Sequence, residues 1–230
     1  GEIGVITAPT GVGKSHMLVN LGCSALKAGF NVIHYTFELT ETGTGLRYDS
    51  NLCQIPSNEV QDRKDEVIEY YKEQGEQLGK LMIKEYPTGT ATVQTLRSHI
   101  EKLSLKGFIP QVLIIDYADI MRSSRQYDSM RHELKKVYED LRNLAMEKSM
   151  PIWTASQSNR DSANSDIVGL ENMSESYGKA QVADVVISIS RKPAEKSEGF
   201  GRLYIAKNRA GRDGIVFPVK LNTAMSRFSI

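Results

Sequence analysis

Residues 3 to 26 contain an apolar run, a glycine-containing run and an amphipathic run in direct succession. The segment from Ile3 to Thr7 is typical of a short buried strand, and residues 9–13 interrupt it with a proline and two glycines. From Lys14 onward, apolar residues recur at helical spacing, at Met17, Leu18, Leu21, Cys23, Ala25 and Leu26. The sequence therefore predicts a strand, a glycine-rich loop and a helix within one small unit.

This loop matches a phosphate-binding pattern except at its first glycine, where the chain has Ala8. Backbone N–H groups of such a loop, together with the start of the next helix, form a nest that favours a polyphosphate, and a Cβ at Gly11 or Gly13 would crowd it. The pattern assigns Lys14 to the β and γ phosphates and the Ser15 hydroxyl to magnesium. The predicted nucleotide-binding residues are Thr10, Gly11, Val12, Gly13, Lys14, Ser15 and His16.

Two other interpretations of the loop compete with this one. A turn before a helix can contain glycine without binding any ligand. A dinucleotide-binding loop would need a third glycine or an alanine where the helix packs on the sheet, and that position is His16. The loop therefore favours ATP over NAD.

Composition limits the fold class and the partners. The 230 residues are 40% hydrophobic, which is enough to bury one sizeable core, so we expect a single domain over residues 1–230. With 29 basic and 28 acidic residues, the chain has no overall attraction to nucleic acid, and such binding would need a local patch.

Cysteine usage and hydropathy bear on location. Cys23 and Cys53 have no metal or redox spacing, so we expect core residues of a reducing compartment. No apolar run approaches 18 residues and no signal peptide is evident, which predicts a cytoplasmic protein with no membrane partner. Because the chain starts inside its first strand, we expect a piece of a longer protein.

The rest of the chain alternates between strand and helix patterns. We expect strands at 31–37, 81–86, 112–117, 151–156, 182–189, 202–207 and 215–221, with helices at 92–105 and 131–145. Residues 45–79 have polar helical patterning and are expected to decorate the core, and residues 158–172 form a long polar loop. The pattern predicts an α/β fold, a mostly parallel sheet flanked by helices with a C-terminal antiparallel hairpin at its edge.

Polar side chains follow three of the predicted strands, where ligands of open α/β sheets bind. Asp116 ends a strongly apolar strand and is the candidate magnesium-side acid. Glu38 is the candidate base that activates water, and its alternative role is that of an acid in the first turn of a helix. Gln157 can hydrogen-bond a γ-phosphate or the attacking water.

Basic residues appear in two later segments. Arg122 and Arg125 lie in a polar loop that we expect to be exposed. Lys207 and Arg209 share one face of the terminal hairpin, where solvated surface is the alternative interpretation. No second cation for the transferring phosphoryl group is evident near the predicted phosphate loop.

Several stretches together resemble the RecA-fold motor domain of DnaB-type replicative helicases. They are residues 8–15, Glu38, 115–117 with 121–122, 156–160, 174–176 with 183–184, and 205–211. Two further stretches, residues 84–89 and 153–155, are similar to the replicative helicases of T-even phages, which indicates a phage enzyme.

The resemblance implies a homohexameric ring that hydrolyses ATP with Mg²⁺ to move 5′ to 3′ on single-stranded DNA and unwind duplex. It implies that Glu38 is the catalytic base, Gln157 the γ-phosphate sensor, and Lys207 and Arg209 cations that act in the neighbour's site. Loops facing the pore would meet DNA through Arg122, Arg125, Arg131, Arg160, Ser174, Glu175 and Gly178. The full-length protein would have a primase and a helicase loader as partners.

Two alternative functions remain open at this stage. A RecA- or KaiC-like ATPase would share the loop and the strand-end acids but would build a filament or a regulated assembly without unwinding. A nucleotide-binding module without hydrolysis would not need Glu38.

Overall fold

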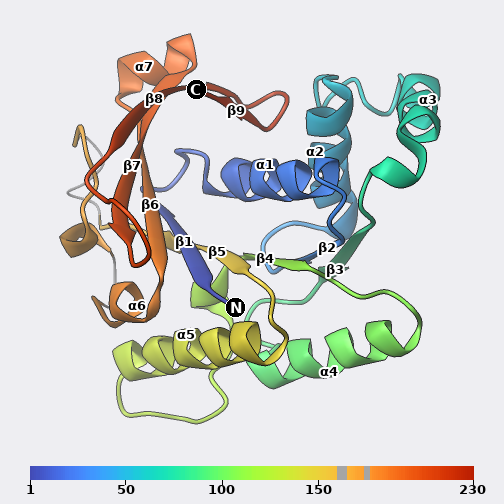
Figure 1. The fold of residues 1–230 in the computed structure, drawn as a ribbon. Coiled ribbons are helices and arrows are strands. Elements are labelled where there is room, and N and C mark those ends of the chain that lie inside the picture. The colour runs from blue at the N-terminus through green and yellow to red at the C-terminus, as the bar shows by residue number, and fades with distance from the viewer. Residues whose placement is uncertain (160–164, 174–176) are drawn as a thin grey trace.

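The computed structural model describes residues 1–159, 165–173 and 177–230, and within them it has a nine-stranded sheet of order β3-β2-β4-β5-β1-β6-β7-β8-β9 (Figure 1). The strands are β1 (Ile3–Ala8), β2 (Val32–Thr36), β3 (Leu81–Glu85), β4 (Val112–Asp116), β5 (Ile152–Gln157), β6 (Val185–Ser190), β7 (Phe200–Asn208), β8 (Val216–Asn222) and β9 (Arg227–Ser229). The helices are α1 (Lys14–Lys27), α2 (Glu41–Cys53), α3 (Lys64–Gln74), α4 (Val93–Leu105), α5 (Met130–Glu147), α6 (Tyr177–Val182) and α7 (Pro193–Glu198).

The pairing confirms the predicted mixed sheet. The strands from β3 to β6 in the sheet order are parallel, and β7, β8 and β9 continue the sheet in antiparallel fashion. The predicted terminal hairpin is β7–β8, but it does not form the edge of the sheet. The edge strand on that side is β9, which is only three residues long, so the sequence shows no alternation of apolar residues there.

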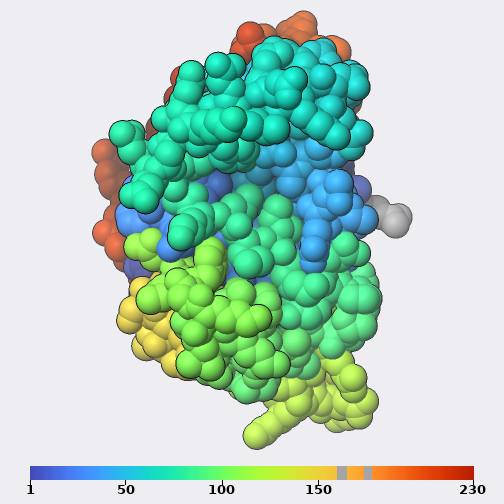
Figure 2. All heavy atoms as spheres, turned by 90° about the vertical axis from the view of Figure 1, so that its right-hand side faces the viewer, coloured from blue at the N-terminus to red at the C-terminus, as the bar shows by residue number. Residues whose placement is uncertain are grey.

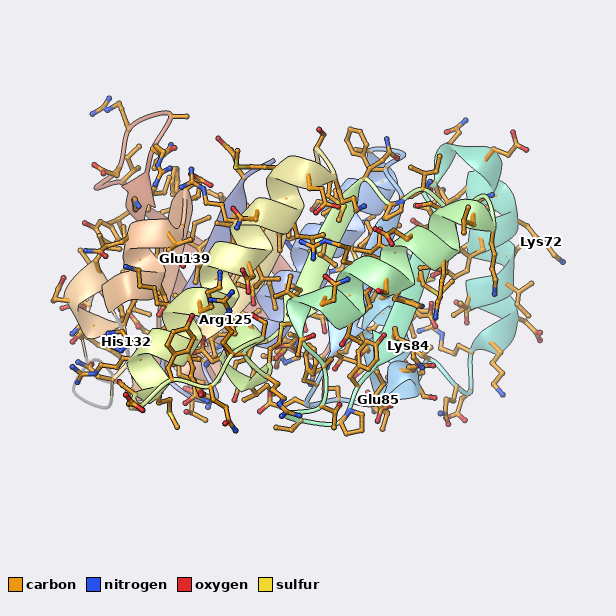
Figure 3. All side chains as sticks on the ribbon, turned by 90° about the horizontal axis from the view of Figure 1, so that it is seen from below. Lys72, Lys84, Glu85, Arg125, His132 and Glu139 are labelled. Carbon is orange, nitrogen blue, oxygen red and sulfur yellow. The ribbon has the colours of Figure 1, made fainter. Side chains whose placement is uncertain are left out.

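Alternate residues of the central strands enter two separate cores, one on each face of the sheet. Val5 and Ile115 pack beneath the sheet with α4 and α5, whereas Ile6 and Ile114 pack above it with α1 and α2. Figures 1 and 3 show these two helix layers, with α4 and α5 side by side across the lower face. Burial of both faces explains why the strand patterns are continuously apolar.

Helix α2 is held at both of its ends. At its start, Glu41 Oε1 accepts from Lys84 Nζ and from the Glu85 amide, both at 3.1 Å, which ties the helix to edge strand β3 (Figure 3 labels Lys84 and Glu85). Near its end, Asn51 Nδ2 donates to the Ser226 carbonyl at 2.7 Å, and Ser50 Oγ donates to the Ala224 carbonyl at 2.9 Å. The turn between β8 and β9 is therefore bound to α2, although about 170 residues separate them.

Figure 2 views the β3 edge of the sheet, with the residues of α3 above it and those of α4 below. β3 is only half-buried, unlike the central strands. The apolar residues that cover this edge include Leu78 and Ile83, which pack against the upper core.

A buried polar cluster joins four elements below the carboxyl ends of β4 and β5. Lys179 of α6 is 0% exposed, and its Nζ donates to Asp119 Oδ2 and Ser156 Oγ, both at 2.9 Å. Asp119 also accepts from the Tyr138 hydroxyl of α5 at 2.7 Å. Because each charged group has two or more hydrogen-bond partners, the ammonium and the carboxylate are tolerated at this depth.

Removing the cation from this cluster should leave the largely buried Asp119 carboxylate without its counter-charge. We expect Lys179→Met to lower the free energy of unfolding by about 3 kcal/mol, as for other broken buried pairs. Urea titration measures this change. The matched control is Lys135→Met, which breaks an exposed i,i+4 pair with Glu139 and should cost less than about 1 kcal/mol. If both variants lost the same free energy of unfolding, the buried ion pair would contribute no more to stability than the exposed pair.

His34 is a buried, neutral histidine. It is 1% exposed, its Nδ1 lies 2.9 Å from the Tyr48 hydroxyl, and its Nε2 has no partner among the described residues. Burial, helped by the positive charge of Arg47, lowers the pKa of His34 to about 3. The unfolded chain therefore binds a proton more tightly than the native protein, so the stability due to neutral His34 is present above pH 6.5 and lost as the pH falls toward 3.

Because the pKa of His34 is lowered in the folded protein, we expect the free energy of unfolding of His34→Gln to fall less steeply than that of the wild type as the pH is lowered. Between about pH 7 and pH 5, the wild-type protein should lose about 2 kcal/mol more than the variant, because glutamine keeps a polar partner for Tyr48 but does not titrate. Urea titrations across this range measure the difference. His132→Gln, on the exposed surface of α5, serves as the control and should leave the slope unchanged. A His34→Gln slope equal to that of the wild type would contradict the assignment.

Candidate nucleotide-binding site

A cavity of about 220 Å³ opens at the carboxyl ends of the central parallel strands. Strand register brings its parts together, since Ala8 pairs with Gln157 across β1 and β5, and Thr36 pairs with Asp116 across β2 and β4. The cavity is lined by Thr10, Gly11, Gly13, Lys14, Ser15, His16, Glu38, Arg47, Asp116, Tyr117, Gln157 and Thr223. The candidates from three separate strand ends and from the loop therefore share one site.

The phosphate loop needs both of its glycines. Gly11 has φ of 72° and Gly13 has φ of 123°, values that side chains with a Cβ rarely adopt. A Cβ at Gly13 would also lie 2.9 Å from Leu221 Cδ2, because β8 packs directly against the loop. Val12 is the one predicted loop residue whose side chain does not line the cavity, since it packs into the core with α1.

Lys14 is held by the loop itself. Its Nζ donates to the carbonyls of Ala8 and Pro9, at 3.1 and 3.3 Å. Burial lowers the pKa of Lys14, and the nearby Asp116 and Glu38 offset part of that effect. The ammonium therefore sits at the cavity wall with weak backbone partners that phosphate oxygens can replace.

Asp116 is a buried carboxylate, and one of its oxygens has no hydrogen-bond partner among the described residues. It is 2% exposed, and the oxygen concerned is Oδ1. Burial raises the pKa of Asp116 to about 6, and Glu38 adds to the rise, whereas Ser15, Arg47 and Lys14 oppose it. An orphaned carboxylate oxygen beside a serine hydroxyl fits the ligand set of Mg²⁺.

The metal would need phosphate oxygens to complete its shell. Within residues 1–159, 165–173 and 177–230, no group of three His, Cys, Asp or Glu side chains could hold a metal ion. Mg²⁺ is commonly bound by one or two protein oxygens together with substrate phosphates and water, so Ser15 and Asp116 fit such a site.

Glu38 is placed by a tight turn after β2. The Thr36 hydroxyl accepts from the Leu39 amide at 3.1 Å and donates to the Leu39 carbonyl at 2.9 Å, which fixes the turn that carries Glu38. Thr40 is the N-cap of α2, where its Oγ1 accepts from the Gly43 amide at 3.0 Å. Glu38 therefore lies outside the helix, and Glu41 is the acid of the first turn.

His16 faces the turn between β8 and β9. Its Nδ1 lies 2.8 Å from Ser226 Oγ. Burial lowers the pKa of His16 to about 4, and the positive charges of Arg47 and Arg191 contribute. A neutral imidazole at neutral pH gives the cavity a hydrogen-bonding group without a charge.

Sequence reasoning missed Arg47, Tyr117 and Thr223, which also line the cavity. Residues 45–79 were expected to decorate the core, and they pack against it, but α2 also carries Arg47 to this site. Arg47 also places a second cation at this cavity, where none was evident from the sequence. Arg47 lies nine positions after Glu38 with no pattern to mark it, and a polar helix gives no signal of which side faces a cavity.

Lys207 and Arg209 lie away from this cavity. Near the end of β7, Asn208 pairs with Val185, at the amino end of the parallel strands and opposite the phosphate loop. Lys207 Nζ donates to the carbonyls of Ala180 and Ala183, and Arg209 Nη1 pairs with Asp184 at 2.9 Å. The Arg209 side chain remains 43% exposed. Neither cation can reach the phosphate loop of its own chain.

The candidate DNA contacts fall into two groups. Arg122, Arg125 and Arg131 are exposed, and the loop between the turn Ala118–Ile120 and α5 projects at the bottom of Figures 1 and 2, with Arg125 labelled in Figure 3. Gly178 lies in α6. Arg160, Ser174 and Glu175 lie outside the described residues.

One further finding concerns membranes. Over the described parts of the chain, no helix combines the length and the apolar character that crossing a bilayer requires.

Comparison with solved structures supports the fold. One solved ATPase domain superposes with a TM-score of 0.84 at 18% identity, over 99% of this chain and 84% of that one. A structure described as a DnaB-like replicative helicase and its interactions with primase also superposes with a TM-score of 0.84. The sequence identity is 16%, over 99% of this chain and 58% of that one. At such identities the likeness establishes the fold, which is RecA-like as predicted.

Sequence comparisons establish the family. A DnaB-like replicative helicase of Enterobacteria phage T4 is 32% identical over 199 residues, covering 82% of this chain and 42% of the phage protein. The replicative DNA helicase DnaB of Mycoplasma genitalium is 27% identical, covering 96% of this chain and 50% of that protein. The chain thus spans half or less of these relatives. Residues 1–229 match the family model described as the DnaB-like helicase C terminal domain, and the chain belongs to that family.

Proposed function

We propose that residues 1–230 act as one ATPase motor unit of a homohexameric replicative DNA helicase. Each unit would hydrolyse ATP at an interface with its neighbour, and the ring would move 5′ to 3′ on single-stranded DNA and unwind duplex. The observation that carries the proposal is the single cavity shared by Lys14, Ser15, Glu38, Asp116 and Gln157. Family membership favours this function over a filament-forming or regulatory ATPase.

Binding would rest on the phosphate loop. The amides at the start of α1 and the Lys14 ammonium would hold the triphosphate, because anions are favoured at a helix N-terminus. Ser15 and Asp116 would hold Mg²⁺, which supplies charge neutralisation between the β and γ phosphates when it is bound. Thr10, Gly11, Val12, Gly13 and His16 would complete the nucleotide contacts.

Hydrolysis would rest on groups from two further strand ends. Glu38 is exposed at the cavity wall and would orient and deprotonate the attacking water. Gln157, opposite Ala8 in the sheet, would hydrogen-bond the γ-phosphate and respond to its loss. Lys207 and Arg209 would serve the neighbour's site, since each lies at the opposite end of the sheet from its own loop.

DNA would pass through the centre of the ring. Arg122, Arg125 and Arg131 would contribute exposed positive charge to the DNA path, together with Arg160, Ser174, Glu175 and Gly178. The longer protein would meet a primase and a helicase loader, in the cytoplasm of a bacterial or phage-infected cell. The structural relative that is described with its primase interactions supports that partner.

The first test separates binding from hydrolysis. Glu38→Gln should retain nucleotide affinity but lose about 10²-fold or more in ATP turnover, because the variant keeps the loop and the metal ligands and loses only the base. Turnover and nucleotide binding are measured with and without single-stranded DNA. Lys14→Ala is the companion variant and should lose turnover with an unchanged fold. A Glu38→Gln variant that loses binding as severely as turnover would make Glu38 structural, and full turnover in Lys14→Ala would refute the phosphate loop.

The second test asks whether the site is shared between subunits. Arg209→Ala should bind ATP normally and hydrolyse it about 10³-fold more slowly, because an arginine supplied in trans stabilises the transferring phosphoryl group. Mixing Arg209→Ala with Lys14→Ala should restore some turnover, since a mixed interface pairs an intact loop with an intact arginine. The control is Arg97→Ala, on α4, where the side chain pairs with Glu147 across the lower helix layer and donates to Gln94 of its own helix, and it should behave as wild type. If exchanging subunits show no recovery, Arg209 does not act across an interface.

A further inference from the structure

The pairing between β4 and β5 ends before either strand reaches the nucleotide cavity. Among the described residues, its last pair is Ile115 with Thr154, so Asp116 and Gln157 lie beyond the backbone ladder that joins these two strands. Each of the two residues is held from its other side, because Asp116 pairs with β2 and Gln157 pairs with β1. The carboxyl edge of the sheet therefore has a seam, which we define as the gap between the ends of β4 and β5.

The seam divides the lining of the cavity into two halves. On one side, Glu38 follows β2 and Asp116 ends β4. On the other side, Lys14 follows β1 and Gln157 ends β5. Because the ladder between β4 and β5 does not extend this far, contacts other than backbone pairing must set the distance between the two halves.

Side chains bridge the seam where the ladder ends. The first bridge is Thr154, whose Oγ1 accepts from the Ala118 amide and donates to the Ile115 carbonyl, both at 3.0 Å. Thr154 is 0% exposed, so water does not compete for these bonds. This bridge holds β5 to the turn that follows β4, one pair beyond the last backbone contact.

Lys179 forms the second bridge, next to the residues that line the cavity. Its Nζ donates to Asp119 Oδ2 and Ser156 Oγ, both at 2.9 Å, and Ser156 Oγ donates to Asp119 Oδ2 at 3.0 Å. Ser156 directly precedes Gln157, and Asp119 lies three positions after Asp116. Three groups that each contact the other two hold a distance more firmly than one hydrogen bond does.

Lys179 acts from outside the cavity. It is 0% exposed and does not line the cavity, so its ammonium would not touch a bound nucleotide. Its helix, α6, is fixed as well, because Lys207 Nζ donates to the Ala180 and Ala183 carbonyls at 2.8 and 2.6 Å and Ala180 packs in the lower core. Any effect of Lys179 on the site must therefore pass through the residues that it holds.

We propose that Lys179 is a positioning residue of the ATPase, which fixes the separation of Asp116 and Gln157 across the seam. The acid on the metal side and the amide that contacts the γ-phosphate would then keep one relative geometry during turnover. Such geometry governs the rate, since a shift of about 1 Å in a positioned group can cost about 10²-fold, whereas affinity rests mainly on the phosphate loop. This inference rests on the proposed function.

The test asks whether Lys179 acts through Gln157. Lys179→Met should lower kcat for ATP about tenfold and leave KM and the affinity for a non-hydrolysable ATP analogue within about threefold of the wild type. In a Gln157→Ala background the same substitution should lower kcat less than about twofold, because the group that it positions is gone. Steady-state turnover on single-stranded DNA and titration calorimetry measure these quantities.

A second variant breaks the bridge without removing a charge. Ser156→Ala keeps the ion pair between Lys179 and Asp119 but loses both hydrogen bonds to Ser156 Oγ. It should lower kcat about threefold in the wild-type background and have no further effect in Gln157→Ala. This variant tests the bridge even where Lys179→Met folds poorly.

The control must lose stability without touching the seam. Leu103→Ala truncates a buried leucine of α4 in the lower core, so it should lower the urea midpoint and keep kcat near that of the wild type at a temperature where the protein is folded. Without nucleotide, hydrogen exchange at the amides of residues 116–120 and 155–157 should rise in Lys179→Met and stay at the wild-type level in Leu103→Ala.

The outcomes separate this inference from the proposed function. If Gln157→Ala hydrolyses ATP as fast as the wild type, the role of Gln157 in the proposed function is refuted and this inference with it. If Gln157→Ala is slow but Lys179→Met costs the same factor in both backgrounds, the inference alone is overturned, because Lys179 would then support the site as a whole. A wild-type kcat in Lys179→Met, or an equal loss of kcat in Leu103→Ala, would overturn it as well.

Discussion

Asp116 is the buried charge on which the arrangement of the site depends. Its strand is central in the sheet, between β2 and β5, so the carboxylate ends an apolar run and is almost fully removed from solvent. One of its oxygens has no partner among the described residues, and burial raises its pKa to about 6. A native structure seldom leaves such a group unsatisfied unless a ligand completes it. The nearby Lys14, Ser15 and Arg47 are the groups that make its ionised form tolerable.

The sheet fixes the relative positions of the side chains that line the nucleotide cavity. Parallel pairing brings the ends of β1, β2, β4 and β5 to one edge, and the register sets Ala8 against Gln157 and Thr36 against Asp116. Short turns then carry the side chains outward, as the Thr36 hydroxyl shows by closing the turn before Glu38. Sites built on strand ends are held more closely than sites on free loops.

Much of this could be predicted from the sequence because its signals are local. Apolar runs mark the central strands, and Gly11, Gly13 and Lys14 mark the loop within a few residues. The acids Glu38 and Asp116 could be identified because each directly follows a recognisable strand. The comparisons confirm the family and the fold that these signals predicted.

The features that were missed depend on contacts between distant parts of the chain. Arg47 and Lys179 lie in polar helices, where periodicity shows which residues face the core but not which charged residue enters it. The partners of Lys179 are 23 and 60 residues away, so no local pattern could reveal the cluster.

Two pairs of cations, Lys14 with Arg47 and Lys207 with Arg209, lie at opposite ends of the sheet. Lys14 and Arg47 line the cavity at the carboxyl edge. Lys207 and Arg209 stand at the amino edge, tied to carbonyls and to Asp184. The Arg209 side chain is 43% exposed, and its partner Asp184 is also paired with Arg142, so Asp184 would keep a cation if Arg209 moved to a phosphate oxygen. A cation that reaches the phosphates only when a second subunit docks would make turnover depend on assembly, whereas a cation fixed in the same subunit lets the nucleotide bind beforehand. If the proposed function holds, assembly would bring the cations of the amino edge to a neighbour's cavity, where Glu38 and Gln157 already stand beside the phosphate loop.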